Sequence, residues 1–293
     1  GVNQGVPITY YNLYISGAPV VNLIKNQNST GDYLVMAVAS LMKKKRVQSV
    51  ERLLNQALEL EETSNNLQSI AKWYNLIGIA KFNAGNAKEA LFNFNKALGI
   101  DPNHRTAAYN AGTLMNQLGD HQSAIKYHSI SIKIDPQYAN AYEGRGNAKD
   151  DLGDTQGAIA DYNKAIEINP QYSRFYYNRG LAKSRSRDYQ GAIADYSNAI
   201  ELDPQHFHSY KDRGNAKSGL GDHQAAITDF NKAIEINPQD ASAYYNSGIA
   251  KSSLGDTQGA IADYNKTIEI NSEHAGAYYN RGIINGKVLG DYQ

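Results

Sequence analysis

The chain has 293 residues, with 29 basic and 29 acidic side chains and no cysteine. The balanced charge gives no net field that would favour nucleic acid or an anionic membrane surface. Without cysteine there are no disulfides, thiolate metal sites or thiol nucleophiles, and the longest apolar run (34–42) is far too short to cross a bilayer.

The first 30 residues lack the periodicity of the rest of the chain. Their Gly, Pro and β-branched content predicts an extended or turn-rich segment, or a short helix that begins at Pro7. The opening GVNQGVPI resembles the tail of trypsin-like serine protease domains that precede repeats in some cyanobacterial proteins. The His, Asp and GDSGG nucleophile motif of such proteases are absent from this sequence, and an unrelated linker is the alternative interpretation.

Residues 31–64 have the rhythm of two amphipathic helices, but they lack regularly placed Gly and Pro. The basic run KKKR (43–46) falls where the first of these helices ends, so it favours the helix dipole and stays solvated. A polar insert, TSNNLQS (63–69), joins this segment to the next.

From Ala71 the sequence repeats every 34 residues, and the hexapeptide GAIADY occurs at 157–162, 191–196 and 259–264. The eighth residue of each unit is glycine: Gly78, Gly112, Gly146, Gly180, Gly214, Gly248 and Gly282. Each unit carries two apolar patterns of helical period, separated by Gly-Asp, in which Gly ends one helix and Asp caps the next. We therefore predict six helix pairs in 71–274, with first helices ending near Gly85, Gly119, Gly153, Gly221 and Gly255.

The spacing of Gly, Ala, aromatic, Ala and Pro over 34 residues resembles the tetratricopeptide repeat (TPR). The phrase NRG.AK...GD.QGAIADYNKAIEINP is similar to cyanobacterial members in particular. The resemblance covers 71–293 and makes 31–64 a degenerate TPR-like unit. It implies an all-α fold, a right-handed superhelical solenoid of TPR helix-turn-helix hairpins. Arg187 departs from the pattern by replacing a helix-ending glycine, and His128 replaces a core aromatic residue.

In this fold the first helices line a concave groove, toward which the fifth and sixth residues of each unit point. The sixth residue is often asparagine, in a row similar to the asparagine ladder of O-linked N-acetylglucosamine transferase, and the row is interrupted at Leu76, Gly144 and Asp212. Amides suit the backbone of an extended peptide, and tyrosine adds rigid apolar contact area. The predicted groove residues are Asn110, Asn178, Asn246 and Asn280 with Tyr109, Tyr177 and Tyr245. The alternative is that these residues are solvated positions on the helix surface without a binding role and that repeat duplication copied them.

Lys211, Asn215 and Asn246 also match the first three positions of the carboxylate clamp of chaperone-binding TPR proteins. The next unit supplies Gly276 and Asn280 instead of two basic residues, which removes most of the charge of such a clamp. On the opposite side, residues three apart in the series Asp161, Lys164, Glu167 predict ion pairs on the helix surface.

The sequence therefore predicts a non-catalytic protein–protein interaction scaffold that binds a peptide or protein partner. No cofactor, metal site, nucleic-acid partner or membrane span is expected. The alternative is the substrate-recognition arm of a larger trypsin-like protease whose catalytic domain is absent from this chain. The compartment stays open: the cytoplasm is slightly favoured, and the periplasm if the protease resemblance holds.

Residues 275–293 match only the first half of a further unit, with the start of a second helix at the closing GDYQ. The first helix should pack on Tyr264 and Ile268 of the preceding unit. Ile284 and Val288 are expected on its outer, uncovered side. An uncovered apolar strip favours self-association through this half unit, and a disordered terminus is the alternative.

Overall fold

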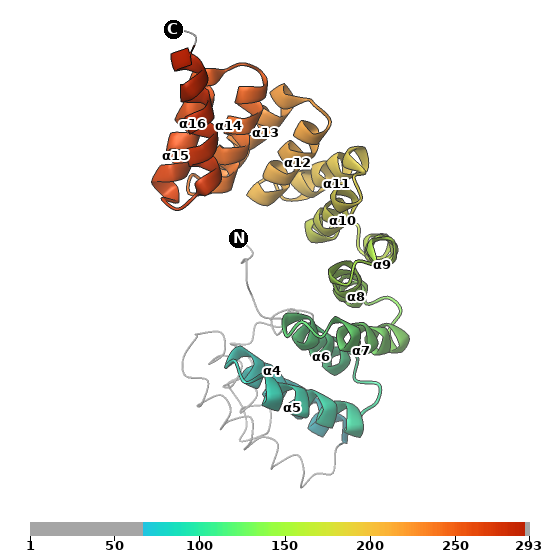
Figure 1. Ribbon diagram of the computed structural model, residues 1–293. Coiled ribbons are helices and arrows are strands. Elements are labelled where there is room, and N and C mark those ends of the chain that lie inside the picture. The colour runs from blue at the N-terminus through green and yellow to red at the C-terminus, as the bar shows by residue number, and fades with distance from the viewer. Residues whose placement is uncertain (1–66, 291–293) are drawn as a thin grey trace, which may run out of the picture. The chain divides into compact units, whose positions relative to one another are not determined.

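The computed structural model describes residues 67–290, and every regular element in this range is an α-helix (Figure 1). Predicted segments 1–30 and 31–64 lie outside the described residues. The chain divides into two compact units, residues 1–152 and 153–293, and each unit is described by itself.

The described part of the first unit consists of α4 (Leu67–Asn83), α5 (Ala87–Ile100), α6 (Arg105–Gln117), α7 (His121–Ile134) and α8 (Ala139–Asp151). The second unit consists of α9 (Thr155–Ile168), α10 (Ser173–Arg185), α11 (Tyr189–Leu202), α12 (Phe207–Gly219), α13 (His223–Ile236), α14 (Ala241–Ser253), α15 (Thr257–Ile270) and α16 (Ala275–Gly290). Within each unit every helix packs against the next one along the chain. The described residues are all-α and form the succession of paired helices that the sequence predicts.

The first helix, α4, begins earlier than the repeat register indicates. It starts at Leu67, inside the insert that was expected to be a polar connection. Ile70, just before the first repeat, is buried, whereas Leu67 is exposed, so the additional turn contributes one residue to the core of the first unit. The polar residues of the insert show no apolar periodicity from which this turn could be predicted.

The first helix of a pair ends where glycine was predicted to end it. Gly85, Gly119, Gly153, Gly221 and Gly255 all have φ between 78° and 85°. After α12 the amide of Gly221 donates to the carbonyl of Ser218 (2.9 Å), and that of Asp222 donates to Lys217 (3.0 Å). The Asp222 side chain then accepts the amide of Ala225 (3.1 Å) and caps α13. One Gly-Asp dipeptide thus ends one helix and starts the next.

An aromatic ring packs against a glycine inside the hairpins α4–α5, α6–α7, α10–α11, α12–α13 and α14–α15. A Cβ built on Gly214 would lie 2.7 Å from the Phe230 ring, so glycine is required for α12 and α13 to approach this closely. The rings of Tyr196, Phe230 and Tyr264 are almost completely buried at equivalent positions. Each copy of GAIADY therefore lies at the start of a second helix, and the tyrosine that ends the hexapeptide fills the core.

A buried carboxylate also ties the two helices of a hairpin together. Asp229 accepts the Nε of Arg213 (2.9 Å) and lies 2.7 Å from the Nζ of Lys217. Asp195 is held in the same way by α10, and Asp263 pairs with Lys251 at 2.7 Å.

The predicted surface ion pairs are therefore only partly correct. Lys164 and Glu167 do pair, at 2.7 Å, on the exposed surface of α9. Asp161 is buried and therefore does not lie on the exposed surface with them. This aspartate precedes the core tyrosine in the sequence and lies on the inner side of its helix.

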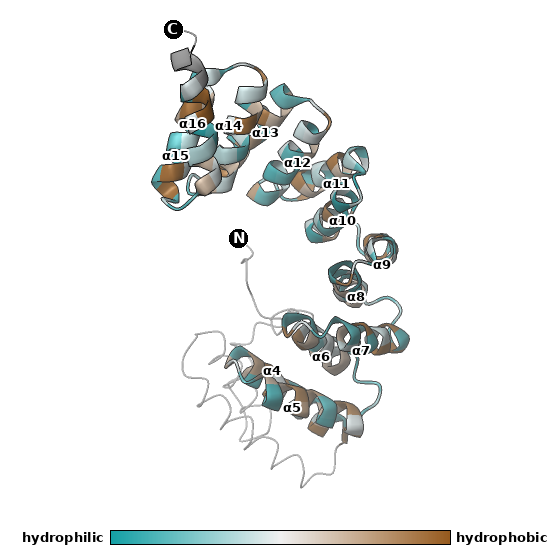
Figure 2. Ribbon diagram, in the orientation of Figure 1, coloured by the Kyte–Doolittle hydropathy of each residue, from teal (hydrophilic) through white to brown (hydrophobic). Residues whose placement is uncertain are grey.

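The last helix packs as expected, although the side assigned to one residue was wrong. α16 packs on α15 through a cluster of Ala260, Tyr264, Ala277 and Ile284, beside Ile268. Ile284 is only 9% exposed. It occupies the repeat position of Ala182, Ala216 and Ala250, each of which packs with the core ring of the preceding hairpin. The exposed apolar residue is its neighbour Ile283, at 41%. Figure 2 shows the hydrophobic character of this part of α16, and the side chain of Val288 lies outside the described residues.

Candidate functional site

The first helices of successive pairs contact one another within each unit. In the first unit α4 contacts α6 and α6 contacts α8, and in the second unit α10 contacts α12 and α12 contacts α14. We use the term "first-helix surface" for the fifth, sixth and ninth residues of the repeats on α10, α12, α14 and α16. All the predicted site residues except Tyr109 and Asn110 belong to these four helices.

The fifth and sixth residues of neighbouring repeats hydrogen-bond to each other. The Tyr177 hydroxyl donates to Asp212 (2.8 Å), and the Asn280 amide donates to the Tyr245 hydroxyl (3.2 Å). In the first unit the Asn110 side-chain amide donates to the side-chain oxygen of Asn75 (2.9 Å). In each case the partners are 35 residues apart, one repeat plus one residue. The ladder residues are therefore ordered by bonds within the chain, which sequence reasoning did not foresee.

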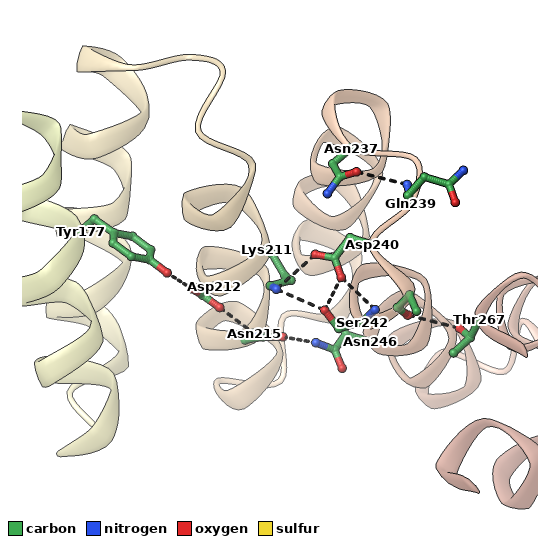
Figure 3. Close-up of polar contacts among 11 residues, drawn as sticks. Tyr177, Lys211, Asp212, Asn215, Asn237, Gln239, Asp240, Ser242, Asn246 and Thr267 are labelled. Atoms are coloured by element: carbon green, nitrogen blue, oxygen red, sulfur yellow. Dashed lines mark hydrogen bonds and ion pairs between the residues drawn. The ribbon is translucent and has the colours of Figure 1, made fainter. Parts of the chain in front are cut away.

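In the second unit these bonds extend into a continuous polar chain, shown in Figure 3. From Tyr177 the chain passes through Asp212 to Asn215, whose amide donates to the Asp212 carboxylate (3.3 Å). The Asn246 amide donates to the side-chain oxygen of Asn215 (2.9 Å). Burial, together with the nearby charge of Asp212, raises the pKa of Tyr177, so the phenol keeps its proton and donates it. The chain joins α10, α12 and α14.

Lys211 is neutralised within the unit. Its ammonium lies 3.1 Å from an Asp240 carboxylate oxygen and 3.1 Å from the Ser242 hydroxyl (Figure 3). Burial raises the pKa of Asp240, but hydrogen bonds from Ser242 and the Lys211 ammonium outweigh it and hold the pKa below its usual value. A lysine already paired in this way contributes little charge to a carboxylate clamp.

Tyr109 and Asn110 contribute to the packing of the first unit. Asn110 is 2% exposed and Tyr109 is 7% exposed. The Tyr109 ring lies 5.5 Å from the His128 ring and 5.2 Å from the Tyr138 ring, measured between centroids. Neither side chain offers surface to a ligand in this conformation.

The structure also explains why the ladder is interrupted at Gly144. A Cβ at this position would lie 2.5 Å from the His128 ring, a distance that real Cβ atoms do not adopt. The replacement of the core aromatic residue by His128 and the loss of the ladder asparagine are thus two parts of one packing arrangement. Both departures are visible in the sequence, but their contact is visible only in the structure.

The described residues 67–290 contain no group of three His, Cys, Asp or Glu side chains that could hold a metal ion. His206 and His208 lie 5.7 Å apart between ring centroids, and His206 shares a 2.7 Å hydrogen bond with the Ser209 hydroxyl. Among the helices from α4 to α16, none combines the length and hydropathy that a membrane crossing requires.

Models of one repeat family match four stretches of the chain. Tetratricopeptide repeat models match residues 75–139, 179–245 and 230–262, and a TPR repeat model matches 146–186. The chain is a tetratricopeptide repeat protein. A comparison with curated protein sequences found no match to this TPR chain. The cyanobacterial type and the protease-tail resemblance stay predictions, and the latter concerns residues outside the described range.

Several solved TPR structures share the fold. YrrB, described as a TPR protein with an unusual peptide-binding site, has a TM-score of 0.56 and 21% identity over 64% of this chain and 97% of its own. MamA has a TM-score of 0.53 and 28% identity over 56% of this chain and 96% of its own. A TPR protein from Parabacteroides merdae has a TM-score of 0.62 and 19% identity, covering 88% of this chain and 99% of that one.

Proposed function

We propose that this TPR chain is a non-catalytic scaffold that binds an extended peptide on the first-helix surface of its second unit. The polar chain from Tyr177 to Asn246 is the observation that carries the proposal. The contributing side chains are Tyr177, Asn178, Lys211, Asn215, Tyr245, Asn246 and Asn280. Tyr109 and Asn110, which sequence analysis also selected, are buried in the first unit, so the proposal does not depend on them.

The amides of this surface have capacity beyond their bonds to each other. An asparagine side chain has two N–H donors and two acceptor lone pairs on its oxygen. In Asn246 the bond to Asn215 uses one donor, which leaves the second N–H and the oxygen for a peptide backbone. Because the internal bonds hold the amides in place, less side-chain entropy is lost on binding.

The spacing of the helices suits an extended ligand. Packed helices lie about 8–10 Å apart, and an extended chain advances about 3.3 Å per residue. One amide-bearing helix therefore corresponds to about three peptide residues. The peptide-binding site named for YrrB supports the same class of ligand for this fold.

The test is a random-peptide phage library selected against the full chain, followed by affinity measurements on the enriched peptides. The variant carries Asn178→Ala, Asn246→Ala and Asn280→Ala. The matched control carries Asn163→Ala, Asn231→Ala and Asn265→Ala, which are exposed asparagines on the second helices.

We expect the first variant to lose most of the affinity and the control to retain it. Both should keep the helical circular dichroism spectrum and cooperative melting of the unsubstituted chain. A library that yields no enriched peptide, or peptides that bind the first variant as well as the control, would refute the proposal.

A further inference from the structure

One residue of the first-helix surface differs in charge from its equivalents. The sixth residue of the repeat is an asparagine on α10, α14 and α16, but on α12 it is Asp212. This carboxylate is half-buried and accepts hydrogen bonds from Tyr177 and Asn215. Neither partner carries a positive charge, so the negative charge of Asp212 persists within the polar chain.

Four other buried or half-buried carboxylates of the second unit are neutralised by a cation. Asp195, Asp229, Asp240 and Asp263 each lie within 3.1 Å of a lysine nitrogen. Asp212 has no such ion pair among residues 67–290, because the adjacent Lys211 is directed to Asp240.

Arg185 acts electrostatically on Tyr177 but forms no ion pair with Asp212 among the described residues, and the two histidines close to Asp212 do not supply a cation either. Burial lowers the pKa values of His206 and His208, so both rings are neutral near pH 7. A half-buried, unneutralised carboxylate on a surface that binds extended chains is complementary to a positively charged ligand group.

The far end of the same surface is apolar. Ile249 on α14 and Ile283 on α16 occupy the ninth position of successive repeats, and both are exposed. Tyr279, one turn before Ile283 on the same face of α16, is 70% exposed. We call these three residues the apolar end. Large exposed apolar side chains grouped in this way are typical of a binding surface.

We propose, on the basis of the function proposed above, that the second unit selects extended peptides in which a lysine or arginine side chain contacts Asp212 and an aliphatic or aromatic side chain contacts the apolar end. The distance between these contacts sets the motif. Helix α14 lies one helix spacing from α12, and α16 lies two spacings from it. These spacings correspond to about three and about six residues of extended peptide. The basic and the apolar residue are therefore about three to six residues apart.

The same phage selection tests this motif. Enriched peptides should contain Lys or Arg about three to six positions from Leu, Ile, Val, Phe or Tyr. The best peptide is then synthesised with its basic residue intact or replaced by Gln, and its affinity is measured by fluorescence anisotropy. The proteins are the unsubstituted chain, Asp212→Asn and the control Glu235→Gln, which removes one exposed carboxylate from the second helix α13.

Asp212→Asn restores the residue found at this position in four other repeats, so the fold should tolerate it. We expect this variant to bind the basic peptide more weakly, on the order of tenfold, whereas Glu235→Gln is unchanged. The Gln peptide should bind the unsubstituted chain and Asp212→Asn equally, because the interacting pair is already lost.

The possible failures are distinguishable. Enriched peptides without a basic residue, or equal affinity of Asp212→Asn and the unsubstituted chain for the basic peptide, would overturn the motif and leave peptide binding intact. A selection that yields no peptide overturns both proposals. Binding to Asp212 without any preference for an apolar residue overturns the role of the apolar end.

Discussion

Replacing Arg187 by glycine should stabilise the second unit. Arg187 has φ of 64° and is exposed, in the turn between α10 and α11. Its amide donates to the carbonyl of Ser184 (3.0 Å), and the next amide, that of Asp188, donates to Lys183 (2.9 Å). These are the same bonds that Gly221 and Asp222 form after α12. Arginine thus occupies a left-handed turn that glycine occupies elsewhere.

The magnitude follows from two opposing terms. A residue with a Cβ in the left-handed region costs about 1–2 kcal/mol. Glycine costs about 0.5–1 kcal/mol more backbone entropy on folding than a residue with a side chain. The difference between the two terms spans about 0–1.5 kcal/mol for Arg187→Gly. Its midpoint of about 0.75 kcal/mol corresponds to a rise in Tm of about 1.5–3 °C for a folded unit of this size.

The assay is urea unfolding followed by circular dichroism, in which the midpoint should rise at constant slope. The matched control is Gly221→Arg, the reverse change in an equivalent turn. No heavy atom lies within 4 Å of a Cβ built on Gly221, so the cost there is conformational and not steric. A midpoint for Arg187→Gly that is unchanged or lower, or a neutral Gly221→Arg, would show that this reasoning is wrong.

Three further changes have expected outcomes. Gly144→Asn should lower the free energy of unfolding by about 1–3 kcal/mol, because its Cβ meets the His128 ring. The control Gly99→Asn, which has open space around its Cβ, should lower it less in the same urea titration. Asp229→Asn should lower the free energy of unfolding by about 3 kcal/mol in that assay, because it leaves two cations facing a neutral amide. A loss smaller than that of an average surface substitution would contradict a stabilising role of the buried Asp229 carboxylate. Ile283→Lys should reduce self-association at high concentration in sedimentation velocity runs, and identical sedimentation of both proteins would exclude this face as a contact.

The sequence by itself determined the fold class and the ends of the helices. A left-handed residue followed by a capping aspartate acts over a few neighbouring residues, so its signal is contained in a short stretch of sequence. Even the exception at Arg187 was predictable, because the turn is fixed by its neighbours and by the repeat register. The core positions could be predicted for the same reason, since an aromatic residue sixteen positions after a glycine recurs from repeat to repeat.

Only the tertiary structure decided which polar groups meet and which faces are covered. Asp212 and Tyr177 are 35 residues apart, Lys211 and Asp240 are 29 apart, and such bonds depend on how two separate helices are placed. The side of α16 assigned to Ile284 was wrong for the same reason: helical periodicity shows that a helix has an apolar side but does not say which neighbour covers it. Sequence selected the candidate ladder, and the packing of the first helices divided it into residues buried within the first unit and residues presented by the second.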